Sequence, residues 1–191
     1  MKRTLMSVAF AVVAALTVAG CGSDTDSNDS TDSSGAQFND ADVTFAQSMI
    51  PHHQQAVEMA TMAQERASSA DVKQLAERIE AAQGPEIDTM AGWLENWGQQ
   101  VSPDSEGGME HSGGDMSGMI SDADMESLGT ATGAEFDQMF LEMMIEHHTG
   151  AIEMAKAEQQ DGESPDAIAL AEKIEADQTA EMAQMENLLG P

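Results

Sequence analysis

The sequence predicts an all-α protein, a four-helix bundle built from two repeated helical hairpins. Residues 45–94 and 140–189 align without a gap at a constant offset of 95, and 22 of the 50 paired positions are identical. Apolar residues in both copies recur every three or four positions, as in a helix, and no segment alternates with the period of two that is typical of a strand. Two hairpins with short connections pack most simply as a bundle of four helices.

The first 20 residues are predicted to be a lipoprotein signal peptide. A basic start ends at Arg3, an apolar stretch runs over residues 5–18, and small residues precede Cys21, as in a removable export signal. The segment resembles a bacterial lipobox, which implies cleavage before Cys21 and lipidation of this only cysteine. An ordinary secretory signal followed by a free cysteine is the alternative. In either case the fold has no internal disulfide.

Residues 21–39 are predicted to form a flexible acidic and serine-rich tether. Gly, Ser, Asp, Asn and Thr dominate this segment, and such a composition buries too little apolar surface to order itself. A flexible chain of this length reaches about 20–25 Å. We therefore expect the domain of residues 40–190 to be exported and lipid-anchored, at the outer face of the cytoplasmic membrane or in the cell envelope.

The formal net charge of −28 limits which kinds of molecule the protein can bind. Nucleic acid is excluded, because phosphate binding needs clustered lysine and arginine. An acidic surface attracts cations. It can equally serve only to keep an exported protein soluble.

The first helix of each copy carries a His-His pair. In the first copy His52 lies on the apolar stripe and His53 beside it, and His147 and His148 repeat this arrangement. Adjacent residues on a helix point about 100° apart, so the two histidines of one pair cannot easily chelate one ion. A shared site would instead take one imidazole from each copy.

The second helices are expected at about 72–97 and 165–189. Ser164 followed by Pro165 is a helix start signal. Pro85, which follows Gly84, is expected to kink or split the first of these helices. A Met- and Gly-rich linker at 98–131 joins the hairpins, with a possible short helix at 122–128.

Methionine is unusually frequent, with 16 residues in the chain. A thioether is a soft ligand that suits Cu(I) or Ag(I), whereas imidazole suits copper, zinc and nickel. The candidate ligands in the bundle are His52, His53, His147, His148, Met49, Met59, Met144 and Met154. The candidates for a second, flexible capture site in the linker are Met109, His111, Met116 and Met119.

Two other interpretations of these residues remain open. Methionines at core spacing often only fill gaps in helical packing. Buried histidines can be hydrogen-bonded core residues or a pH-sensitive structural element. No catalytic constellation is found, because neither His-His pair has the Glu-x-x-His spacing of di-iron bundles and the His-Glu-x-x-His protease motif is absent.

The doubled pattern Phe-x3-Met-Ile-x-His-His-x2-Ala-[Val/Ile]-Glu-Met-Ala, followed by Leu-Ala-Glu-[Arg/Lys]-Ile-Glu-Ala-x-Gln-x2-Glu-x3-Met-x3-Leu, resembles the DUF305 family of exported bacterial proteins. The resemblance covers about residues 40–190. It implies a ferritin-like four-helix bundle outside the cytoplasm, with some members linked to copper binding and tolerance. The resemblance also implies that the family's characteristic His and Met residues correspond to the eight candidate ligands in the bundle named above.

Three functional hypotheses follow. The first is a membrane-tethered protein that binds copper, preferably Cu(I), for sequestration or handover, with Ag(I), Cu(II) or Zn(II) as other possible ions. The second is a helical module that binds another envelope protein and whose histidines are structural. The third is a ferritin-like redox metalloenzyme.

Overall fold

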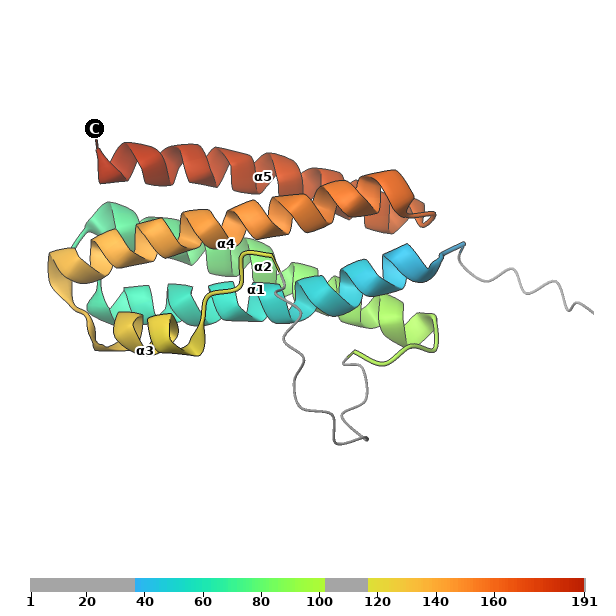
Figure 1. Cartoon of the computed structure of the whole chain (residues 1–191), viewed down its shortest axis with the longest axis horizontal. Helices are drawn as coiled ribbons and strands as arrows, with labels where there is room; N and C mark the ends of the chain where they lie inside the picture. Colours follow the sequence, from blue (N-terminus) through green and yellow to red (C-terminus); the bar gives the residue numbers. More distant parts are fainter. Residues whose placement is uncertain (1–36, 102–116, 191) are drawn as a thin grey trace, which may run out of the picture. The chain divides into compact units, whose positions relative to one another are not determined.

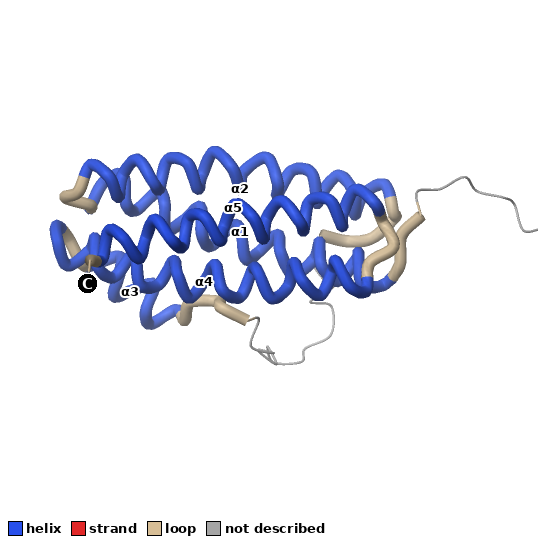
Figure 2. The backbone as a smooth tube through the Cα atoms, turned by 90° about the horizontal axis from the view of Figure 1, so that it is seen from above, coloured by secondary structure: helices blue, strands red, loops and turns tan. Residues whose placement is uncertain are grey.

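The computed structural model describes residues 37–101 and 117–190, which are almost entirely helical (Figure 1). The helices are α1 (Asp40–Arg66), α2 (Ala70–Asn96), α3 (Asp122–Thr130), α4 (Gly133–Asp161) and α5 (Pro165–Leu189). Within the described ranges there is no strand, only one isolated bridge between Ala67 and Gly133 (Figure 2). The predicted all-α class is confirmed.

Four long helices form the bundle. α1 and α2 are joined by residues 67–69 and α4 and α5 by residues 162–164, so each repeat is a tight hairpin. The hairpins meet mainly through α1 and α4, while α2 and α5 also touch. The short α3 packs on α4. This arrangement confirms the predicted bundle of two hairpins.

Side-chain caps define the starts of α1, α2 and α5. Ser164 accepts a hydrogen bond from the Ala167 amide, with Pro165 in the first turn of α5, as the sequence predicts. Ser69 caps α2 in the same way. At α1, Asn39 and Asp42 form a reciprocal capping box.

Two equivalent aspartates join the hairpins at opposite ends of the bundle. Asp42 of α1 accepts a hydrogen bond from the Ser164 amide at the start of α5, at 2.9 Å. Asp137, 95 positions later on α4, accepts from the Ser69 amide at the start of α2, at 3.0 Å. Each repeat thus caps the second helix of the other repeat. These bonds fix α1 and α4 in antiparallel directions, so the middles of the two helices meet.

The internal prolines do not interrupt the helices. Pro51 lies inside the continuous α1 and Pro85 inside the continuous α2. The expectation that Pro85 splits its helix is wrong. Pro85 is exposed, so the carbonyl that loses its amide partner there can be solvated, and packing on both sides of the proline holds the helix together.

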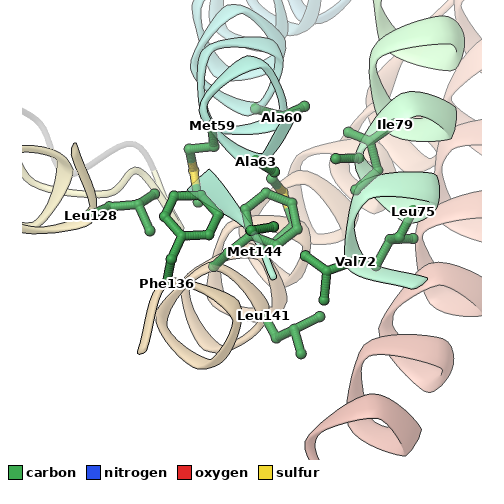
Figure 3. Packing of buried hydrophobic residues seen from close by; sticks show 14 of the residues in the cluster. Met59, Ala60, Ala63, Val72, Leu75, Ile79, Leu128, Phe136, Leu141 and Met144 are labelled. Atoms are coloured by element: carbon green, nitrogen blue, oxygen red, sulfur yellow. The ribbon is translucent and has the colours of Figure 1, made fainter. Parts of the chain in front are cut away.

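The core consists of two apolar clusters, one on each side of the histidines. One contains Met59, Met144 and Phe136 with residues of α2 and Leu128 of α3 (Figure 3). The other contains Met49, Met90 and further residues of all four long helices. The histidine layer therefore lies at mid-length of the bundle. Among the described residues, no helix is both long and apolar enough to cross a membrane.

Candidate metal centre

All four histidines of the two His-His pairs are completely buried. His52 of α1 and His147 of α4 are in direct ring contact, with centroids 3.7 Å apart and planes inclined at 38°. The crossing of the two helices at their middles brings these rings together. One imidazole from each repeat thus lies at the centre, the arrangement expected from the helical stripe.

The flanking histidines each bind a carboxylate. His53 Nε2 lies 2.8 Å from Glu86 Oε2, and His148 Nε2 lies 2.7 Å from Glu181 Oε2. A carboxylate only accepts hydrogen bonds, so Nε2 carries the proton in both rings. In the neutral ring, the lone pair is then on Nδ1, which in both histidines has no hydrogen-bond partner among the described residues. Carboxylate–histidine pairs of this kind orient metal-binding imidazoles.

The two glutamates are candidate site residues that the sequence patterns did not single out. Glu86 and Glu181 occupy equivalent positions, 95 residues apart, and both belong to the repeated Gln-x2-Glu motif. Their identity in both repeats was the available signal. The glutamines of the same motif, Gln83 and Gln178, are also buried, and neither amide finds a partner.

The two carboxylate–histidine pairs differ in charge. Glu86 also binds the Lys173 ammonium group, at 2.8 Å. The residue equivalent to Lys173 in the first repeat is Arg78, which instead donates to the Gln184 side chain at 2.6 Å. The centre is therefore asymmetric although the backbone repeats.

Burial makes the central rings neutral. Desolvation, with the nearby His53 ring as the next cause, lowers the pKa of His52 to about 3. Desolvation and the contact with His52 lower the pKa of His147 to about 2. A neutral imidazole is the form that binds metal. Among the residues that the structure describes, none forms a hydrogen bond with either ring nitrogen of His147.

The methionine candidates lie at different depths. Met49, Met59 and Met144 are completely buried in the apolar clusters beside the histidines. Met49 and Met144 are each one helical turn from a central histidine on the same helix. Met154 is partly buried and lines a cavity of about 370 Å³ between α1 and α4, together with Asp40, Phe45, Glu158 and Asp161.

The remaining candidates lie near or beyond the ends of the described segments. Met119 is half-buried in the segment before α3. Met109, His111 and Met116 of the capture site, and Cys21, lie outside the described residues.

The donor set at the centre consists of imidazoles, with methionine thioethers nearby along the same helices. Within 37–101 and 117–190, no three His, Asp or Glu side chains cluster closely enough to hold a metal ion. The centre offers instead two touching neutral imidazoles, with thioethers one turn away. Imidazole and thioether ligands suit Cu(I) or Ag(I).

The fold and this centre define a class: helical bundles that enclose histidines between two repeated hairpins. The chain belongs to the DUF305 family, described as a domain of unknown function, which its residues 42–189 match. No curated protein matches the sequence.

Solved structures of the family share this fold. A DUF305 protein from Streptomyces coelicolor, described as a candidate secreted protein, is 36% identical, with a TM-score of 0.71 over 78% of this chain and 91% of the other. A DUF305 fragment from Deinococcus radiodurans is 31% identical, with a TM-score of 0.71 over 80% and 97%. CopM in its Cu(II)-bound form is 34% identical, with a TM-score of 0.66 over 78% and 95%. CopM has also been solved with Cu(I) and with silver.

Proposed function

We propose that this protein binds copper, preferably as Cu(I), for sequestration or handover outside the cytoplasm. The observation that carries the proposal is the contact between the His52 and His147 rings, which are neutral, fully buried and supplied by different repeats. CopM, which is 32% identical in its Cu(I)-bound form, supports copper as the ion.

The unpartnered ring nitrogens give this proposal its physical basis. Buried polar atoms normally have hydrogen-bond partners, yet within residues 37–101 and 117–190 Nδ1 of all four histidines has none, and neither has Nε2 of His147. Leaving such atoms unpaired costs about 1–3 kcal/mol each. A metal ion bound to some of these lone pairs would offset that cost. Met49 and Met144 are the nearest thioether candidates along the two helices.

The cellular location is part of the proposal. The predicted signal peptide and the relative described as a candidate secreted protein support export. Lipid on Cys21 would hold the protein at the membrane, and the segment up to residue 39 would serve as the tether. A tethered copper-binding protein could pass its ion to a neighbouring envelope protein without catalysis.

A Cu(I) titration against a competing chelator, under reducing conditions, tests the proposal. The mature protein should compete for Cu(I), and a variant lacking residues 105–115 should retain one tight site in the bundle. Absence of Cu(I) binding by the mature protein would refute copper binding. Loss of all Cu(I) binding in the deletion variant would show that the copper site lies in the linker and not in the bundle.

One observation favours a second candidate function. His53 and His148 are each held by a glutamate through Nε2, as expected of structural histidines in a module that binds an envelope protein. Under that hypothesis, replacing His52 and His147 by Gln lowers the thermal stability. Under the same hypothesis, the unchanged protein binds metal only weakly and nonspecifically, and the histidine substitutions leave that weak affinity unchanged.

A further inference from the structure

The segment Ser117–Ile120, which we call the strap, lies directly on the histidine centre. The Ser117 carbonyl oxygen is 3.2 Å from His52 Nε2. Ile120 exchanges two hydrogen bonds with the Gln55 side chain, at 2.8 Å through its amide and 2.9 Å through its carbonyl. The Ile120 side chain is buried. The strap is therefore anchored on α1 on either side of its glycine.

A glycine contact holds the strap against α4. A Cβ atom on Gly150 would overlap the Ser117 carbonyl, and one on Gly118 would approach the Gly150 Cα to 2.8 Å. Gly118 also has a φ of +79°, which favours glycine. The Ser117 hydroxyl donates to Glu153 of α4. Only a residue without a side chain at position 150 allows this approach.

The strap contacts the two repeats unequally. Gln55 and Gly150 occupy equivalent positions in the repeats. Gln55 binds the strap through its side-chain amide, whereas Gly150 has no side chain and so lets the strap backbone lie directly against α4. In the same way, Ser117 contacts the His52 ring, whereas no residue in the described part of the chain forms a hydrogen bond with the His147 ring. The strap thus breaks the symmetry of the two central rings.

We propose that the strap positions His52 by fixing its proton on Nε2, which leaves Nδ1 as the only nitrogen of this ring that can bind metal. A carbonyl oxygen only accepts hydrogen bonds, and a neutral imidazole has one donor and one acceptor nitrogen. His147 has no comparable constraint. The consequence for metal rests on the proposed function: His52 can bind an ion through Nδ1 alone while His147 can use either nitrogen.

Nitrogen NMR of the histidine rings in the metal-free full-length protein tests this proposal. His52 should be a single tautomer protonated on Nε2. In Gly150→Ala the strap is displaced, so His52 should lose that single tautomer while His53 and His148, held by carboxylates, keep theirs. Gly84→Ala is the matched control, because a Cβ there meets nothing within 4 Å, and it should leave all the rings unchanged.

Hydrogen exchange at the Ile120 amide reports independently whether the strap has moved. If Gly150→Ala does not fold, Gly118→Ala replaces it, since a Cβ there would lie 2.8 Å from the Gly150 Cα and would leave the Gln55 side chain in place as the partner of Ile120. Two results would overturn the proposal: a His52 ring protonated on Nδ1 in the unchanged protein, or an unchanged His52 tautomer in a variant whose Ile120 amide exchanges faster. Because no metal is present, failure here is distinguishable from failure to bind copper.

Discussion

The imidazole rings of His52 and His147 touch at the centre of the bundle, with centroids 3.7 Å apart. Each ring comes from a different repeat, so the contact exists only when both hairpins are assembled. The carboxylate-bound histidines flank it, and apolar clusters lie on both sides along the bundle. A buried histidine layer of this kind has consequences for metal affinity, stability and pH dependence.

Glu181→Gln should weaken Cu(I) binding about 10- to 100-fold, the usual effect of removing a carboxylate that orients a metal-binding histidine. The amide preserves the shape of the side chain but lacks the charge, so His148 is held less firmly. Competition titration measures the change, and Glu58→Gln, at an exposed position, is the control. Equal affinities for the two variants would show that Glu181 has no part in metal binding.

Met144→Leu separates packing from metal binding. A volume-conserving change in the core should cost less than about 1.5 kcal/mol of unfolding free energy. If the thioether binds Cu(I), the affinity should fall by about tenfold or more, because one soft donor is lost. Met90→Leu is the matched control, since Met90 is also completely buried but lies on α2. An affinity that falls no further than in the control would assign Met144 to packing.

Asp137→Ala should lower the free energy of unfolding by about 1–2 kcal/mol, because the cap that Asp137 provides for α2 is lost. Its carboxylate accepts from the Ser68 and Ser69 amides, both at 3.0 Å. Urea denaturation measures the difference, with Asp88→Ala at an exposed position in mid-α2 as the control. If both variants unfold at the same urea concentration, the cap between repeats contributes nothing measurable.

Glu158 should make stability depend on pH. Burial, reinforced by the neighbouring Asp42 carboxylate and by Asp161, raises the pKa of Glu158 to about 8. Its ordinary pKa is 4.5, so between these values the folded state binds more protons than the unfolded state, and stability falls as pH rises.

Glu158→Gln removes this proton exchange. The variant should gain stability relative to the unchanged protein as pH rises from 4.5 to 8, and the difference should level off above that range. Thermal unfolding of both proteins across this range measures it. The two proteins differ only at residue 158, so the comparison isolates this carboxyl group. A difference that is constant with pH would contradict the raised pKa.

The helices and the central histidine contact were predictable from the sequence because they depend on local periodicity and on the repeat. His52 and His147 lie on the apolar stripes of equivalent helices, and two equivalent helices that bury their stripes against each other meet at equivalent residues. The constant repeat offset and the family resemblance both point to two equivalent hairpins that bring these histidines together.

The partners of the flanking histidines were not predictable in the same way. Glu86 lies 33 residues from His53, on another helix, so the pairing depends on how the hairpin aligns its two helices. The position of the strap was also not predictable from the sequence, because it depends on close packing of the Ser117 carbonyl against the Gly150 backbone, two residues that are far apart in the chain. The continuity of α2 through Pro85 was not predictable from the local rule that proline breaks a helix, because packing of the helix on both sides of the proline outweighs it.

Anomalous X-ray diffraction from crystals of the full-length protein loaded with Ag(I) or Cu(I) tests the central claim most directly. The account predicts a metal peak in the bundle at the His52–His147 contact, within bonding distance of the His147 ring. Metal bound only to surface carboxylates or to the linker, with both central rings unmoved, would contradict it.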